Sequence, residues 1–431
     1  MSNWFNLKLK SGALQLTVFI IAVIAILLAA VLTLTYVHRF FIEQSKASIK
    51  IIKNSNDGFQ HLFNSDDNRN DTLLFSKNDE ENSYQIRTHQ SNWGIFEKGW
   101  VETSYRTRKF KKIGLIGSSF KEENRPALYL KETFKPLVVV GETEIRGLSF
   151  LPEQGVKSGN IAGESYYGTQ LIYGPTQKSG VKLPEIKKSV KNFVSQFISS
   201  NFQLTNENYL ENGNPKNTNS FFSPTKYIKS SQIVRLENCS LTGNIIVKSD
   251  TLVSIRKSAL LRDIIVVAPY VEIEEGFNGN LQVFSTKSIR IQKNCTLNYP
   301  SALILVNQEK EVANYSSPNN QIFIDSGTIV SGTVCYFSTA VENNFGTQVI
   351  LQPQSQVRGE LYCEGNIEVM GWINGTLYAH QFVSNKAGSV FMNHLFNAKI
   401  SSEKIQPEFA GILFENNLQI SKKKSIIKWL Y

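Results

Sequence analysis

The chain has 431 residues, 41% of them hydrophobic, and a formal net charge of +10, so it holds enough apolar material for a large folded core. Its basic runs, residues 109–112, 187–188 and 422–424, are short and lack the interleaved arginine and aromatic residues of a nucleic-acid groove. The composition therefore argues against a nucleic-acid partner, and we expect each basic run to be a solvated surface.

The N-terminal region contains an uncharged run at residues 14–36, which is long enough to span a bilayer. Lys8 and Lys10 precede it. The run is too long for the apolar core of a cleaved secretory signal, and residues 33–41 offer no small-residue cleavage site. We predict a retained transmembrane helix over residues 13–38.

The orientation of this helix is less directly coded, because positive charge flanks both of its ends. A short basic head, residues 1–12, and a long tail favour the head in the cytoplasm. We therefore expect a single-pass protein of the bacterial inner membrane with its C-terminal part outside the cytoplasm.

The residues around Gly12 carry a family resemblance. Lys8-Leu9-Lys10-Ser11-Gly12, followed by an apolar segment, resembles the N-terminus of a type IV pilin or pseudopilin precursor. In that family a membrane peptidase cuts a basic leader after its final Gly, and the apolar helix packs in a filament core. Thr17 stands where most members have Glu. The resemblance implies a processing site between Gly12 and Ala13, and a plain signal anchor remains the alternative.

Residues 39–125 follow the membrane segment and read as an extracytoplasmic stalk and a strand-rich region. The helix is expected to continue over residues 40–56. Residues 64–82 are rich in Asn, Asp and Ser and predict an exposed loop. The alternation at residues 93–115 predicts a few strands.

Short strands broken by Gly fill residues 126–183 and read as the first turns of a coil. Residues 184–231 interrupt them with a helix and a polar loop. Pro184 suits a helix start, and the loop is expected at residues 206–219. One helical face would carry Val190, Phe193, Val194, Phe197 and Ile198.

The most informative pattern is a repeat within residues 232–384. The triplets Val253-Ser254-Ile255, Val271-Glu272-Ile273 and Ile289-Arg290-Ile291 each start 18 residues after the one before. A second motif, apolar-x-Gly-x-apolar, lies between them and is centred on Gly243, Gly279, Gly332, Gly359 and Gly375. Asp263 replaces Gly in a near copy.

This period predicts an all-β fold, a right-handed parallel β-solenoid (β-helix) with an N-terminal transmembrane helix and a short inserted helix. The flanking residues of each triplet should point inward and stack in two columns, while Ser254, Glu272 and Arg290 point outward. Gly should occupy corners, where the φ angle is positive and backbones pass closely. Residues 307–320 and 339–346 read as insertions, and residues 385–431 as a C-terminal cap.

Residues 330–379 resemble the bactofilins, a family of polymer-forming bacterial scaffold proteins built as a right-handed β-helix. Their rungs show the same alternation of apolar-x-Gly-x-apolar corners and apolar-polar-apolar strands, here centred on Gly359, Glu368 and Gly375. The resemblance implies a scaffold architecture for roughly the repeat region.

Residues that carry catalytic chemistry are sparse. His38, His61, His89, His380 and His394 are far apart in the sequence and form no metal-ligand spacing. Asp263, Glu272 and Glu274 are the nearest candidates for a carboxylate cluster of the kind that cleaves polysaccharide, although they also suit ordinary outward positions. We therefore predict no catalytic, cofactor or metal site.

The four cysteines are expected to stay free thiols, even though an extracytoplasmic location permits disulfides. Cys239 and Cys295 are 56 residues apart, about three turns of the coil. Cys335 follows Gly332 by three residues and Cys363 follows Gly359 by four, so the first should face outward and the second inward.

We expect a non-enzymatic protein with a structural or scaffolding role in the bacterial cell envelope. Its partners would be the membrane, through the N-terminal helix, and envelope proteins or further copies of itself. Two alternatives stay open: a minor pilin-like subunit of a type IV pilus or type II-like secretion system, and a solenoid that binds or cleaves envelope polysaccharide.

Overall fold

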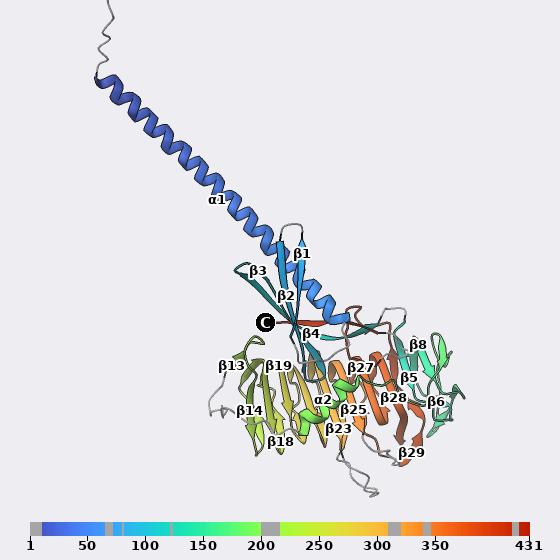
Figure 1. The fold of residues 1–431 in the computed structure, drawn as a ribbon. Coiled ribbons are helices and arrows are strands. Elements are labelled where there is room, and N and C mark those ends of the chain that lie inside the picture. Colours follow the sequence, from blue (N-terminus) through green and yellow to red (C-terminus); the bar gives the residue numbers. More distant parts are fainter. Residues whose placement is uncertain are drawn as a thin grey trace, which may run out of the picture. The chain divides into compact units, whose positions relative to one another are not determined.

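The computed structural model describes residues 11–64, 72–79, 82–120, 124–199, 216–308, 320–338, 346–415 and 422–431. It is mostly strand, with a large parallel sheet and an apolar N-terminal helix (Figure 1). Contacts divide the chain into two units. The first comprises Met1–Gln60, Leu73–Thr88 and Val101–Lys111, and the second comprises His61–Thr72, His89–Trp100 and Lys112–Tyr431.

The first unit is built on helix α1 (Ser11–Asn64), a longer helix than the stalk expected from the sequence. Its N-terminal half exposes its large hydrophobic side chains, from Leu14 to Ile42. Its C-terminal half buries Ile51 and Phe59. The helix therefore changes from an apolar rod without a protein partner to a packed helix.

The packed half of α1 contacts strand segments that belong to the first unit. Four strands follow one another in the sheet, β1 (Thr72–Asp79), β2 (Asn82–Trp93), β3 (Phe96–Tyr105) and β4 (Arg108–Phe120). A Cβ on Gly58 would lie 2.5 Å from Val101 Cγ1, so Gly permits the close approach of helix and sheet. Strand β1 occupies part of the loop expected at residues 64–82, and residues 65–71 and 80–81 lie outside the described part.

The second unit consists chiefly of three stacks of parallel strands, in which most strands pair with the one a turn later in the chain. Six long strands each contribute to two or three stacks: β19 (Leu260–Val267), β21 (Asn278–Ser285), β23 (Thr296–Asn307), β25 (Ile329–Ser338), β27 (Gln356–Val369) and β28 (Trp372–Lys386).

Stack A contains the first residues of these long strands together with β13 (Lys216–Asn219), β16 (Ser240–Gly243), β31 (Lys399–Ser401) and β7 (Glu144–Arg146). Stack B contains their later residues together with β14 (Lys226–Ser230), β17 (Ile245–Ser249), β5 (Pro126–Leu130), β8 (Leu148–Leu151) and β12 (Thr176–Lys178). Strand β13 occupies the end of the polar loop expected at residues 206–219, whose residues up to 215 are not described.

Stack C contains the ends of β27 and β28 together with β15 (Val234–Leu236), β18 (Leu252–Ile255), β20 (Tyr270–Ile273), β22 (Ser288–Ile291), β24 (Gln321–Ile324) and β26 (Val349–Leu351). The remaining strands are β6 (Leu137–Val140), which lies between β30 (His394–Phe396) and β9 (Val156–Ser158), the antiparallel pair β10 (Asn160–Ile161) and β11 (Glu164–Ser165), β29 (Ser389–Met392) and β32 (Lys422–Leu430).

Stack C confirms the predicted register. Val253 pairs with Val271, which pairs with Ile289, and Ile255, Ile273 and Ile291 form the second column. All six side chains are at most 1% exposed. Glu272 and Arg290 are exposed and Ser254 is half-buried. The 18-residue repeat is thus a true stacking period of the strands.

Stack B is buried on both of its faces. Ile264 and Val266 point into the core shared by the three stacks, while Ile265 and Val267 point away from it into a second apolar cluster. This cluster also takes in helix α2 (Lys188–Ser199) and residues 410–413. Double burial explains why stack B strands read as continuous apolar runs rather than alternating ones.

The order of stacking differs from the order of the chain. Strand β5, from the region expected to form the first turns, pairs with β28 near the end of the repeat (Figure 1). Strand β31 pairs with β28 on one side and with β7 on the other. Residues 126–178 therefore extend the stacks beyond β28 and do not precede β13. Part of residues 385–431, expected as a cap, is built into the stacks.

Local elements follow the sequence with small shifts. Helix α2 begins at Lys188 instead of Pro184, and it buries Val190, Val194, Phe197 and Ile198 as the periodicity predicts. Gly359 has a φ angle of +147°, and a Cβ there would lie 1.9 Å from the carbonyl oxygen of Gly332 in the neighbouring strand. The corner glycine is therefore required at this position. The expected insertions at 307–320 and 339–346 fall largely on residues 309–319 and 339–345, which are not described.

Candidate functional site

The three carboxylates singled out in the sequence do not form one site. Asp263 stands at the corner that follows stack A, whereas Glu272 and Glu274 lie in and after stack C. Glu272 is exposed. Backbone N–H donation by Lys257, followed by the Arg256 guanidinium 2.8 Å away, lowers the pKa of Glu274. The arrangement provides no pair of carboxylates for acid–base chemistry.

The other sequence candidates are dispersed as well. Within the described residues, no group of three His, Cys, Asp or Glu side chains could hold a metal ion. Gly12 and Ala13 lie in the exposed first turn of α1.

All four cysteines are buried and none of them forms a disulfide. Cys335 pairs with Tyr362 while Tyr336 pairs with Cys363, so the two thiols face opposite sides of stack B, as the spacing predicts. The outward Cys335 is nevertheless fully buried, because the second apolar cluster covers it, and burial raises the pKa of its thiol.

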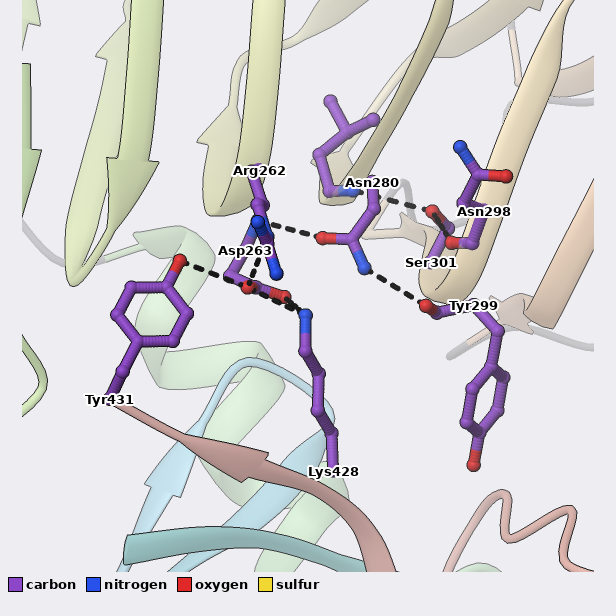
Figure 2. A network of polar contacts seen from close by, with 9 residues as sticks. Arg262, Asp263, Asn280, Asn298, Tyr299, Ser301, Lys428 and Tyr431 are labelled. Carbon is purple, nitrogen blue, oxygen red and sulfur yellow. Dashed lines mark hydrogen bonds and ion pairs between the residues drawn. The ribbon is translucent and has the colours of Figure 1, made fainter.

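A network of polar contacts surrounds Asp263 in the second unit (Figure 2). Lys428 Nζ lies 2.6 and 2.7 Å from the two carboxylate oxygens, and the Tyr431 hydroxyl donates to one of them at 3.1 Å. Burial, and then the Asp263 charge, raise the pKa of Tyr431. The side chain of Asp263 is only 2% exposed, so this carboxylate is internally neutralised and unavailable to a substrate.

The backbone of Asp263 explains why a corner glycine could be replaced there. Its φ angle is +59°, in the left-handed region that Asp tolerates better than most residues. Its N–H donates to Asn280 Oδ1 at 2.7 Å, and Asn280 in turn donates to the carbonyl of Tyr299 at 3.1 Å (Figure 2). Asp263 therefore tolerates the corner conformation and also provides the carboxylate to which Lys428 donates.

A second lysine of strand β32 reaches a fully buried carboxylate. Lys422 Nζ contacts Glu360 Oε1, and Glu360 Oε2 accepts from the Ile412 N–H at 2.9 Å. The lysine side chain is 4% exposed and its ammonium lies over the rings of Phe120 and Phe414. Burial lowers the pKa of Lys422 to about 8, although the charge of Glu360 opposes this effect.

A third lysine of the same strand completes the pattern. Lys424 Nζ lies 3.2 Å from Glu97, which is also 3.2 Å from Lys187 and accepts a hydrogen bond from Gln90. Alternate positions of β32 thus carry lysines that meet three carboxylates from distant parts of the sequence, Glu97, Asp263 and Glu360. These three lysines, hereafter the lysine strap (Lys422, Lys424 and Lys428), hold β32 in place within the second unit.

Sequence reasoning missed the lysine strap. The run at residues 422–424 was expected to be solvated, which is wrong for Lys422 and Lys424 and correct only for Lys423, which is exposed. The available signal was the group of β-branched and aromatic residues at Ile426, Ile427 and Trp429, residue types that are enriched in strands.

The remaining functional surface is the apolar half of α1. Of the described helices, only this one is long and apolar enough to cross a membrane, and none of its most apolar 18-residue window is buried by protein. Fully burying a Leu or Ile side chain is worth about 1.5–3 kcal/mol relative to leaving it in water. A solvent other than water, or other protein, is therefore needed around this segment.

Comparisons with protein-family models, with curated proteins and with solved structures found no match for this chain. The apolar helix and the stacked strands are thus the features from which a function has to be argued.

Proposed function

We propose that this chain is a single-pass protein of the bacterial inner membrane with a structural role in the cell envelope. The observation that carries the proposal is the unpartnered apolar half of α1, which continues without a break into a half packed on its own sheet. Such a helix joins a membrane segment rigidly to a folded part. The second unit then lies outside the cytoplasm, as the short basic head favours.

In this proposal the three stacks form a right-handed β-solenoid, the architecture that the bactofilin resemblance implies. Parallel strands joined by crossovers have a strong right-handed preference, which supports the hand. The structural role is supported by the buried carboxylates. Asp263, Glu97 and Glu360 are each neutralised by a lysine of the chain, so they stabilise the fold and do not face a substrate. The chain holds or assembles envelope proteins, or further copies of itself.

Crosslinking in intact cells tests this role. Full-length protein should be recovered in defined complexes with envelope proteins or with itself, and these should persist in a Glu272→Gln variant, whose exposed side chain takes no part in the internal pairs. Purified protein that cleaves envelope polysaccharide, with activity lost in Glu272→Gln or Glu274→Gln, would contradict it.

A more specific form of the proposal is a minor pilin-like subunit. The feature that favours it is α1, a helix of 54 residues. Its N-terminal half is apolar and exposed, and its C-terminal half packs against strands of the first unit. Such a helix suits a subunit whose apolar half leaves the bilayer for a filament core, as the resemblance around Gly12 implies.

N-terminal sequencing of the membrane-extracted protein tests the pilin-like form. The expected sequence begins at Ala13, and a Gly12→Val variant should retain Met1 while a Ser11→Ala control is still cut. An intact Met1 in the unmodified protein would exclude this form and leave the simple anchor.

A further inference from the structure

A hollow of about 410 Å³ lies in the second unit, where the first turn of α2 meets the later residues of stack B. Its polar lining comes from Lys131, Lys182, Glu185, Lys188, Lys191, Tyr362, Glu364 and His380, and Leu183 and Ile186 supply an apolar wall. The volume falls within the range of small-molecule sites, roughly 300–1,000 Å³.

One lysine of this hollow is neutralised internally. Lys191 Nζ lies 2.7 Å from Glu364 Oε1, and Glu364 Oε2 accepts from the Ser338 N–H at 2.9 Å. The Tyr362 hydroxyl lies 3.4 Å from the same carboxylate and 3.2 Å from the carbonyl oxygen of Pro184, the nearer acceptor for its one hydrogen. Glu364 is therefore occupied, and its charge does not balance the other lysines.

Lys131 differs from Lys191 because its nearest polar side chain is an imidazole and not a carboxylate. Lys131 Nζ lies 3.3 Å from His380 Nε2, and His380 Nδ1 lies 2.9 Å from the carbonyl oxygen of Glu364. An ammonium can only donate and a carbonyl can only accept, so Nε2 accepts from Lys131 and Nδ1 carries the proton. An imidazole carries no negative charge, so His380 orients the ammonium group of Lys131 without balancing its charge.

The positive N-terminal end of α2 is not available to a ligand. The Lys188 N–H already donates to Glu415 Oε1 at 2.8 Å, so the positive end of the helix is occupied by a carboxylate of the chain. Among the lining residues this leaves Lys131, Lys182 and Lys188 against Glu185, an excess of two positive charges at neutral pH (3 − 1 = 2). The Glu415 carboxylate beside Lys188 reduces the local excess to one. Charge of one sign in a concave site concentrates anions there.

We propose that this hollow binds a phosphoryl group carried by a sugar-sized molecule. A phosphate monoester has a charge of about −1.5 to −2 at neutral pH and accepts hydrogen bonds through three oxygens, so it suits the positive sign of the excess charge and the lysine donors. The apolar wall formed by Leu183 and Ile186 leaves room for the rest of the ligand. The proposal does not depend on the membrane anchor, so either one can fail without the other.

Isothermal titration of full-length protein in a non-ionic detergent tests it, with glucose 1-phosphate as the soluble probe and dihexanoyl phosphatidic acid as the lipid-headgroup probe. Glucose is the neutral control. At least one phosphoryl probe should bind, glucose should not, and binding should weaken with added salt. The probe that binds more tightly assigns the source of the phosphoryl group, a soluble sugar phosphate or a lipid.

Lys131→Met and Lys182→Met should each weaken binding by about tenfold, since each removes one hydrogen bond to a charged group. Lys293→Met, a change of an exposed lysine outside the hollow, should leave binding unchanged. Lys182 is itself exposed, so its variant should keep the thermal unfolding midpoint of the unmodified protein. Absence of binding by both phosphoryl probes, or binding by both hollow variants as tight as that of the unmodified protein, would overturn the proposal.

Discussion

The inner columns of stack C and the outer face of stack B are both buried, but they are buried by different means. In stack C, Val271 is covered by Val253 and Ile289, residues a fixed distance away along the chain. On the outer face of stack B, Ile265 and Cys335 are covered by α2 and by residues 410–413. Burial in stack C recurs at every turn of the repeat, whereas burial on the outer face of stack B depends on single long-range contacts. Substitutions in the two regions should therefore change the free energy of unfolding by different amounts.

The largest effect is expected where a long-range contact involves charge. Lys422→Met leaves the carboxylate of Glu360 buried without its partner, which should lower the free energy of unfolding by about 3–5 kcal/mol. Urea unfolding of the full chain measures it. The double variant Lys422→Met with Glu360→Leu should recover most of the loss, and Lys423→Met, at an exposed neighbour, should lose none.

Truncation of an inner column should cost somewhat less. Ile289→Ala removes a fully buried side chain between Val271 and Ile322 and should lower the free energy of unfolding by about 2–5 kcal/mol. Arg290→Ala, one residue later and exposed, should stay within about 0.5 kcal/mol of the unmodified protein. Equal losses for the two variants would show that the register of stack C is wrong.

Asp263 belongs to both kinds of burial, because it stands at a repeated corner and receives a long-range lysine. Asp263→Ala removes the acceptor of Lys428 and Tyr431, which should cost about 1–3 kcal/mol. Asp263→Gly relieves the positive φ but loses the same hydrogen bonds, so it should cost less than Asp263→Ala. A larger cost for Gly than for Ala, in the same urea assay, would contradict this account of the corner.

The smallest expected effect is a pH dependence. Burial lowers the pKa of Lys422 to about 8, below its ordinary value near 10.4. Between these values the unfolded chain holds a proton that the folded chain has released, so the contribution of Lys422 to the free energy of unfolding rises with pH. The stability difference between the unmodified protein and Lys422→Met should therefore widen from pH 8 to 10, and a narrowing would contradict the buried position of this lysine.

The sequence predicted the part of the fold that is periodic. The 18-residue spacing identified the columns at Val271 and Ile289, and the spacing of Gly359 identified a corner that only Gly fits. It could not predict that β5 stacks on β28, because parallel pairing leaves no signal of which turn lies next to which. It also could not predict the lysine strap, since a Lys that meets a buried carboxylate looks like a solvated Lys when its partner is distant in the chain.

The proposed hollow and the anchor differ in the same way. The anchor was predicted because a bilayer imposes a length on one continuous segment, residues 14–36. The hollow joins Lys131, Lys182 and His380 from three separate regions, and no spacing in the sequence connects them.

The central claim, an anchored protein with its stacked unit outside the cytoplasm, is tested most directly by labelling a single introduced cysteine. The four native cysteines are at most 4% exposed and should give little background. Lys157→Cys places a thiol on an exposed position of β9. In intact spheroplasts a membrane-impermeant maleimide should label this cysteine on a membrane-bound chain. Labelling only after the membrane is disrupted, or a chain recovered in the soluble fraction, would contradict the account.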